Sequence, residues 1–204
     1  MDPIYLDHAA TTPVRPEILE AMLPYLQTAW GNPSSAHRLG RTARAGLEQA
    51  KRETAEALGV EPNEVIFTSG GTEADNLAII GAAFAARAAG RPMHVVTSSI
   101  EHKAALAAAH AVRRMGGIET ILPVDGNGIV SLEALDAVLP ENPALVSVMW
   151  VNNEVGVVQP MEEIGARCRA AGVPLHSDGV QAFGKIPIDL DAVGVSLLSI
   201  SGHK

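Results

Sequence analysis

Cysteine and aromatic residues are scarce in this chain of 204 residues, and these shortages limit the kind of fold and the kind of core that the chain can form. The only cysteine, Cys168, cannot form a disulfide within the chain, which excludes a small secreted fold held together by internal disulfides and favours a reducing, cytoplasmic compartment. Aromatic residues make up 3% of the chain, so alanine, valine, isoleucine and leucine must fill most of the core.

Basic residues and long apolar runs are also in short supply. The formal net charge of −8 argues against a broad surface for nucleic acid or anionic membranes, although it leaves room for a local pocket that binds one phosphate. The first residues lack the basic start and apolar run of a signal peptide, and the longest apolar stretches, such as 82–86, fall far short of a membrane span. Hydrophobic residues still make up 47% of the chain, enough for the core of one domain, or of one domain and part of another.

Short runs rich in β-branched residues alternate with amphipathic segments along the chain. This alternation predicts an α/β fold with a mostly parallel sheet, and no internal repeat or interdomain linker interrupts it. Ser131 is expected to cap one of the helices. The expected helices span 15–27, 36–58, 72–89, 101–115, 131–139 and 161–171, and the expected strands span 65–68, 94–97, 119–123, 144–150, 174–178 and 195–200.

Polar side chains gather in the loops that follow the expected strands. In an open α/β sheet, ligands bind beyond the carboxyl ends of the strands. Their shared location therefore predicts a ligand site, although each loop by itself also has an ordinary structural explanation. The loops contain residues 69–72, His102, residues 152–153, Asp178 and residues 201–204.

A glycine pair, Gly70 and Gly71, stands between an expected strand and an expected helix and is followed by Thr72. Glycines allow close approach to an anion, and the free N–H groups at a helix start favour phosphate. The alternative is an ordinary helix start with Thr72 as N-cap and Asp75 three residues later. The run is neither a Walker A loop nor a dinucleotide-binding fingerprint.

Asp178 ends an expected strand, and Gln181 follows three residues later. A carboxylate that faces the pyridine nitrogen of pyridoxal phosphate (PLP) would keep that nitrogen protonated and make the ring a better electron sink. The same spacing also fits a capping box at a helix start, without any cofactor. Both interpretations stay open on this evidence.

Two further loops carry groups that could face an aromatic cofactor. The amide of Asn152 or Asn153 could donate to a phenolic oxygen, but asparagine is also common in turns because it bonds its own backbone. His102 could lie on a cofactor ring or transfer protons, since histidine titrates near neutrality, or it could simply be solvated.

Lys204 and Cys168 are the two candidate nucleophiles. Lys204 follows a small turn after an apolar strand, where a lowered pKa would let it form a Schiff base with an aldehyde; the alternative is a solvated surface lysine. Cys168 shares a helical face with Met161, Ile164 and Ala171, which predicts a buried, inert thiol rather than a nucleophile.

These motifs together resemble those of the cysteine desulfurases that supply sulfur for iron–sulfur clusters, a family within the fold-type I PLP enzymes. The resemblance covers the whole chain in order and implies the large domain of an aspartate aminotransferase-like PLP-dependent transferase. It implies an N-terminal active-site segment over 1–14 and a PLP-binding domain over 15–204. The matching runs are 5–13, 31–35, 67–76, 101–103, 151–159, 176–181 and 201–204.

The resemblance also implies a role for each site residue, and no metal. Lys204 would attach PLP covalently and, once freed, move a proton from the substrate. His102 would stack on the pyridine ring, and Asp178 would pair with its nitrogen. The remaining expected contacts are Asn153 and Gln181 to the phenolic oxygen, and Gly71, Thr72, Ser201 and His203 to the phosphate.

The implied reaction converts L-cysteine to L-alanine and transfers the sulfur to an enzyme cysteine as a persulfide, for iron–sulfur assembly or tRNA thiolation. A homodimer, a scaffold or sulfur-acceptor protein as partner, and a cytoplasmic location are expected. Members continue well past their PLP lysine, into a part that holds the persulfide cysteine and an arginine for the substrate carboxylate. The chain that ends at Lys204 is therefore expected to be incomplete and inactive by itself. Selenocysteine lyase or cysteine sulfinate desulfinase activity, or a non-catalytic PLP-binding fragment, are the alternatives.

Overall fold

The computed structural model describes residues 4–204, and this part of the chain divides into two compact units. One unit contains the chain through residue 67 together with His203, and the other contains residues 68–202 together with Lys204. The expected division at residue 14 stays a prediction, and its residues 1–3 lie outside the described part. None of the helices in residues 4–204 is both long and apolar enough to cross a membrane.

The first unit is built on two helices, α1 (Pro16–Gln27) and α2 (Arg38–Leu58), followed by a short 3-10 turn, η1 (Pro62–Glu64). Both helices confirm the sequence-based expectation to within two residues. The two helices pack closely at Gly46 of α2, where the Tyr25 side chain of α1 lies against the glycine backbone. A Cβ atom at position 46 would lie 2.3 Å from the Tyr25 hydroxyl. No residue of α1 is buried within the described chain.

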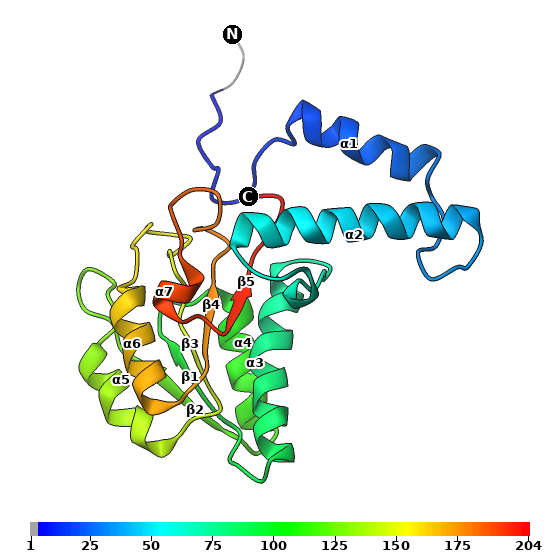
Figure 1. Ribbon diagram of the computed structural model, residues 1–204. Helices are drawn as coiled ribbons and strands as arrows, with labels where there is room; N and C mark the ends of the chain where they lie inside the picture. Colours follow the sequence, from blue (N-terminus) through cyan, green and yellow to red (C-terminus); the bar gives the residue numbers. More distant parts are fainter. Residues whose placement is uncertain (1–3) are drawn as a thin grey trace. The chain divides into compact units, whose positions relative to one another are not determined.

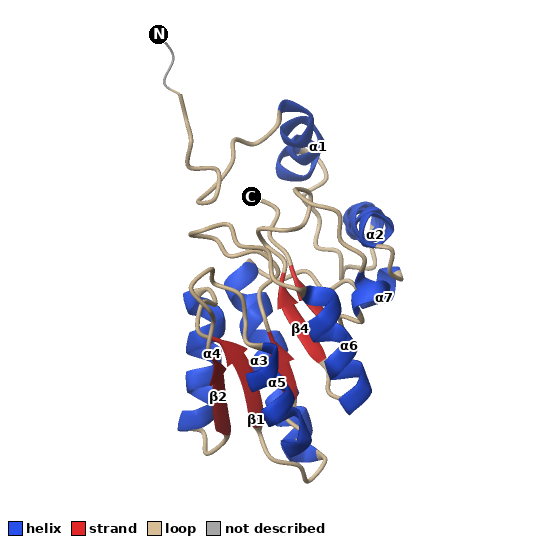
Figure 2. Cartoon of the chain, turned by 90° about the vertical axis from the view of Figure 1, so that its left-hand side faces the viewer, coloured by secondary structure: helices blue, strands red, loops and turns tan. Residues whose placement is uncertain are grey.

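The second unit contains a parallel sheet, which confirms the predicted α/β fold. Within residues 4–204 its five strands follow the order β2-β1-β3-β4-β5, and all neighbouring pairs are parallel. The arrowheads in Figure 2 therefore point to the same edge. The strands are β1 (His94–Ser98), β2 (Ile118–Leu122), β3 (Leu145–Ser147), β4 (Leu175–Asp178) and β5 (Leu197–Ser199).

Helices cover both faces of this sheet (Figure 1). On one face lie α3 (Gly71–Ala88) and α4 (Lys103–Arg114). On the other lie α5 (Leu132–Val138), α6 (Met161–Ala171) and the short α7 (Leu190–Val193), with the 3-10 turn η2 (Leu139–Glu141) after α5. Strand residues alternate between the two resulting cores: Val95 packs with α3 and α4, whereas Val96 packs with α5 and α6.

One expected strand is wrong. Residues 65–68 form no strand in the described chain, even though their composition is β-like. Val65 is buried, but Ile66 and Phe67 are 70% and 49% exposed, and none of the described strands pairs with this segment. Because a strand is stabilised by its ladder to a neighbour, β-branched residues alone do not make one.

The strand order contains a switch point, which is where a ligand is expected in such a sheet. The connection after β1 leads through α4 on one face to β2, whereas the connection after β2 returns through α5 on the opposite face to β3. Such a reversal opens a gap between the carboxyl ends of the two strands that flank it, here β1 and β3. The sheet therefore directs the search for a site to the loops after β1, β3 and β4.

Candidate functional site

Most of the predicted site residues belong to loops at this edge of the sheet. His102 follows β1, Asn153 follows β3, Asp178 ends β4, and Ser201 and Lys204 follow β5. The sequence-based expectation that these four loops come after parallel strands is thus confirmed, whereas residues 69–72 follow no strand, because residues 65–68 form none. The geometry of their side chains indicates which of these loops could bind a ligand.

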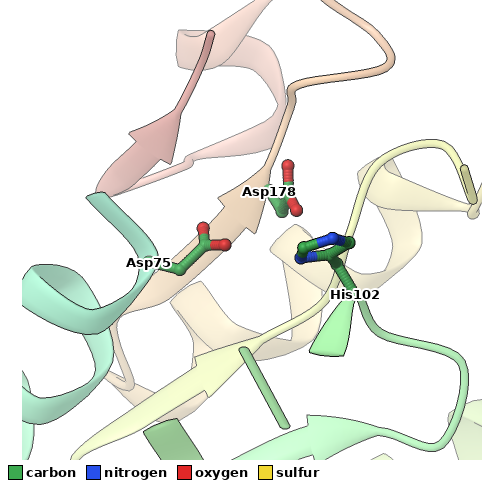
Figure 3. Close-up of side chains that lie close together, drawn as sticks. All are labelled: Asp75, His102 and Asp178. Carbon is green, nitrogen blue, oxygen red and sulfur yellow. The ribbon is translucent and has the colours of Figure 1, made fainter. Parts of the chain in front are cut away.

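Three side chains converge from different elements at this edge (Figure 3). Asp75 comes from α3, His102 from the residue before α4, and Asp178 from the end of β4. One polar atom from each lies within 4.8 Å of the others. Asp75 and Asp178 are buried, and His102 is half-buried. Two buried carboxyl groups beside an imidazole form an unusually polar cluster, of the kind found at ligand sites.

Asp178 is held by its own turn rather than by a helix. Its Oδ1 accepts a hydrogen bond from the Val180 N–H at 2.9 Å, and the residues after it form turns. The alternative that Asp178 and Gln181 form a capping box is therefore wrong, because no helix begins here. Burial raises the pKa of Asp178, while the Val180 N–H and the charges of His102 and Lys204 oppose the rise.

Glu101 ties the ends of two strands together and was not singled out by the sequence. Its Oε1 accepts hydrogen bonds from the Ser98 hydroxyl at 2.6 Å and the Met149 N–H at 2.9 Å. Its Oε2 has no hydrogen-bond partner within the described residues, and burial raises the pKa of the group to about 8. Glu101 therefore fixes the loop that carries His102 against the segment after β3.

His102 is oriented by the helix that it precedes. It is the N-cap of α4, and its Nδ1 accepts a hydrogen bond from the Ala104 N–H at 3.2 Å. Accepting this bond leaves Nε2 as the ring nitrogen able to carry the proton in the neutral form. The imidazole thus has a defined orientation next to Asp178, which a freely solvated histidine would lack.

The N-terminus of α3 has the geometry of an anion site. Its N-cap is Gly70, whose φ of +157° belongs to a region that essentially only glycine occupies. The alternative that Thr72 is the N-cap is therefore wrong, since Thr72 lies inside the first turn. That turn presents backbone N–H groups and the positive end of an 18-residue helix, an arrangement that suits a phosphate.

The two asparagines after β3 have different roles. Asn152 is buried: its Nδ2 donates to the Ile100 carbonyl at 2.8 Å, and its Oδ1 accepts from the N–H groups of Glu154 and Val155. The turn interpretation is therefore confirmed for Asn152. Asn153 is half-buried and donates to the Glu154 carboxylate at 2.8 Å, so its proposed contact to a phenolic oxygen stays a prediction. The same holds for Gln181, which is buried and accepts a bond from Lys185.

The last residues divide between the two units. His203 belongs to the first unit, where its carbonyl accepts a bond from the Thr12 N–H at 3.0 Å and its Nδ1 lies 3.1 Å from the Thr11 hydroxyl. Ser201 and Lys204 belong to the second unit. The expected phosphate contacts of Ser201 and His203 stay predictions, whereas the charge of Lys204 acts on Asp178.

Cys168 is buried in this fold. Its side chain is 1% exposed in the core between the sheet and α6, and burial raises the pKa of its thiol to about 11. The predicted burial of Cys168 is therefore confirmed, and its lack of reactivity stays a prediction, since the thiolate is the nucleophilic form.

The donor set of the second unit fits PLP. A carboxylate for a pyridinium, an oriented imidazole for an aromatic ring, a glycine-led helix start for a phosphate and a lysine amine are the groups that this cofactor requires. Asp75, which lies in the same cluster as His102 and Asp178, was missed by the sequence analysis. The signal was available, because Asp75 continues the buried stripe of Ile79, Ala83 and Ala86 toward the start of α3, where an acidic residue is unexpected.

Comparison with known proteins gives a consistent result. The family described as aminotransferase class-V matches residues 4–204. The chain is 46% identical to the cysteine desulfurase IscS of Methanosarcina thermophila over 98% of its length and 49% of the relative's. It is 47% identical to the mitochondrial cysteine desulfurase of Arthroderma benhamiae, over 99% of its length and 40% of the relative's.

A solved structure, that of SspA in complex with cysteine, has the same fold. Its TM-score is 0.92 at 39% identity, over 98% of this chain and 57% of that one. The chain therefore spans about half the length of the relatives that it matches.

Proposed function

Because this chain belongs to the class-V aminotransferase family, we propose that the protein of which it forms a part is a PLP-dependent cysteine desulfurase. The relatives named cysteine desulfurase support the activity, and the related structure with bound cysteine supports the substrate. The observation that carries the proposal is the buried carboxyl group of Asp178, at a strand end beside His102 and within the electrostatic reach of Lys204.

Several residues of this chain would each hold a different part of PLP. Bound PLP supplies an electron sink for the bonds at the substrate Cα. Lys204 would attach it covalently, and Asp178 would bind its pyridine nitrogen as an anion. His102 would lie against the ring and is oriented to hold or release a proton at Nε2. The lesser contacts would come from Asn153 and Gln181 to the phenolic oxygen, and from Gly71, Thr72 and Ser201 to the phosphate.

The proposed reaction breaks the C–S bond of L-cysteine and releases the carbon skeleton as alanine. The sulfur forms an S–S bond with a cysteine thiol of the enzyme, which loses its proton, and the electrons of the broken C–S bond stay on Cβ, which takes up a proton to become the alanine methyl group. The amine of Lys204 would return to Cα the proton that it had removed. Cys168 is unsuited to accept the sulfur, because its thiol is buried and its pKa is raised to about 11. The acceptor thiol would therefore come from another part of the protein.

The proposed cellular role depends on the acceptor that receives the persulfide sulfur from the enzyme. We infer that it passes to an iron–sulfur scaffold or to a carrier for tRNA thiolation, and that the enzyme is a cytoplasmic homodimer. The lone, buried cysteine supports a reducing compartment. The relative from Arthroderma benhamiae is named as mitochondrial, so cell fractionation is the test of the location.

Alanine release from L-cysteine by the full-length protein with PLP tests the activity. We expect alanine and a protein-bound persulfide in equal amounts in the first turnover, and neither from the Lys204→Ala variant. Faster alanine release from selenocysteine or cysteine sulfinate than from cysteine would transfer the assignment to those substrates. No alanine from any of the three would contradict the proposal.

A further inference from the structure

Asp75 is the most unusual residue in the site, and the proposed reaction does not use it. It lies on α3 with 1% of its surface exposed, in line with apolar residues such as Ile79. Its Oδ1 has no hydrogen-bond partner within the described residues. A buried carboxylate with one oxygen left without a partner is unfavourable, so the group must either carry a proton or lie next to a cation.

The nearest imidazole does not provide that cation. His176 Nε2 lies 3.8 Å from Asp75 Oδ1, but His176 is wholly buried and burial lowers its pKa to about 4. Both of its ring nitrogens are already engaged, Nδ1 with the Ser147 hydroxyl at 2.8 Å and Nε2 with the Ser199 hydroxyl at 3.0 Å. His176 is therefore neutral near physiological pH and leaves Asp75 without a counter-charge.

The neighbouring acid competes with Asp75 for ionisation. Asp178 lies in the same cluster, with ligand atoms within 4.8 Å, and two buried carboxyl groups so close cannot both ionise at low cost. Asp178 has the Val180 N–H and the charges of His102 and Lys204 in its favour. Asp75 has only the Ser199 hydroxyl, and its pKa is raised to about 7 by burial and by Asp178.

Glu101 also faces this carboxyl pair, and its protonation state leaves the preference for the anion on Asp178 in place. Glu101, in the segment before α4, is buried with a pKa raised to about 8, and it interacts electrostatically with both Asp75 and Asp178. It is therefore largely neutral near pH 7 and adds little negative charge. The Lys204 charge and the Val180 N–H act on Asp178, so the anion is favoured there and the proton on Asp75.

We propose that Asp75 is a positioning residue that holds the proton of this buried carboxyl pair and thereby leaves the single negative charge on Asp178. This inference rests on the proposed function, in which Asp178 binds the pyridine nitrogen of PLP. Asp75 does not touch the reacting atoms in this account. It sets the charge of Asp178, which binds the cofactor, and it keeps the net charge of the Asp75–Asp178 pair at −1 on the acid side of neutrality.

The Asp75→Asn variant tests the proposal, because an amide mimics the neutral acid and cannot ionise. In the full-length protein, we expect its Kd for PLP near pH 6 to stay within about twofold of the wild type. Above about pH 7 only the wild type gains a second negative charge on the Asp75–Asp178 pair. This second charge favours the protonated form of the bound cofactor. The midpoint of the absorption titration of bound PLP should therefore be higher in the wild type, by about half a pH unit or more.

A second readout needs no cofactor. The raised pKa of Asp75 makes the folded wild type lose stability as pH rises from its unfolded value toward about 7, whereas Asp75→Asn has no such loss. The melting temperature of the variant minus that of the wild type should therefore increase with pH across this window. A purely structural Asp75 would give a difference that is the same at every pH. Asp191→Asn, the same chemical change at an exposed position of α7, should show neither effect.

Two results would overturn the proposal. A loss of PLP affinity of about tenfold or more in Asp75→Asn near pH 6 would mean that Asp75 acts there as the anion. Equal titration midpoints together with a pH-independent melting difference would mean that Asp75 does not titrate beside the site. Unchanged PLP affinity in Asp178→Asn would instead contradict the proposed function, so the two failures are distinguishable.

The wild type can decide the matter directly if Asp75→Asn does not fold. Carbon-13 resonances of labelled aspartate carboxyl groups differ between the protonated and ionised forms. We expect the protonated shift for Asp75 and the ionised shift for Asp178 near pH 6, and the opposite assignment would contradict the proposal.

Discussion

The two faces of the sheet carry different kinds of side chain. Against α3 and α4 the core is lined by small residues, among them Ala83, Ala105, Ala108 and Ala109. Against α5 and α6 it is filled by larger ones, such as Leu135, Trp150, Met161 and Ile164. The helices of the first face also carry, at or just before their starts, the candidate site residues Gly71, Thr72, Asp75 and His102, whereas α6 on the second face carries the buried Cys168.

The two faces therefore have different roles: the α3 and α4 face positions the candidate site residues, and the α5 and α6 face contributes more to stability. Alanine side chains let α3 and α4 pack closely on the strands, and Asp75 and His102, near the starts of these helices, lie beside Asp178 at the end of β4. The larger side chains on the other face bury more apolar area per residue and contribute more to the hydrophobic free energy of folding. We therefore expect substitutions on the two faces to act on different properties, cofactor affinity on one and stability on the other.

The largest effect on stability is expected from Leu135→Ala. Leu135 is fully buried on the α5 face, and its truncation should lower the free energy of unfolding by about 2–5 kcal/mol through lost burial and a cavity. Urea unfolding measures this loss, and the affinity of the folded protein for PLP should be unchanged. A marked fall in PLP affinity with little loss of stability would contradict the separation of the two faces.

Asp178→Asn should have the largest effect on the cofactor. The amide keeps an Oδ1 atom for the Val180 N–H, so the turn should survive, but the negative charge is lost. Removing a charged hydrogen bond of about 1.5–3 kcal/mol should weaken PLP binding by about 10- to 100-fold. Equilibrium binding followed by absorption measures the change. Wild-type affinity in the variant would show that Asp178 serves only the turn.

Overpacking the alanine face should give an intermediate effect. Ala109 is fully buried on α4, and Ala109→Leu should cost about 1–3 kcal/mol of unfolding free energy because α4 must move away from the sheet. That movement should also weaken PLP binding, since His102 begins this helix. Ala107→Leu, at an exposed position of the same helix, should change the unfolding free energy by less than about 0.5 kcal/mol. Equal effects of the two variants would mean that the alanines have no packing role.

Cys168→Ala should have the smallest effect. Removing one buried sulfur atom should cost about 1 kcal/mol, and cysteine desulfuration should continue at the wild-type rate. In the wild type, a thiol reagent should modify Cys168 slowly near neutral pH, because burial raises the pKa of the thiol to about 11. Mass mapping of the persulfide checks the same point, and sulfur found on Cys168 would contradict it.

The sequence predicted the layers of the second unit well and its local contacts poorly. Period and capping signals placed α6 to the residue, and Ser131 was identified as the N-cap of α5, where its hydroxyl accepts from the Ala134 N–H at 3.1 Å. Residues 65–68 were misassigned because strand formation depends on a partner that local composition does not reveal.

The site showed the same limit. Strand–loop order was enough to gather His102 and Asp178, but not to find Asp75 or Glu101. Both acids lie in the interior, and their importance comes from burial and from neighbours on other elements. Such effects are set by tertiary structure, which is why the capping interpretations of Thr72 and Asp178 could be rejected only in three dimensions.

The central claim is that Lys204 holds PLP at the end of this chain segment. Borohydride reduction of the full-length protein with bound PLP fixes the cofactor to its lysine, and peptide mass mapping then identifies the residue. We expect one adduct, on the peptide that contains Lys204, and none in the Lys204→Ala variant. An adduct on another lysine, or one that persists in the variant, would contradict the account.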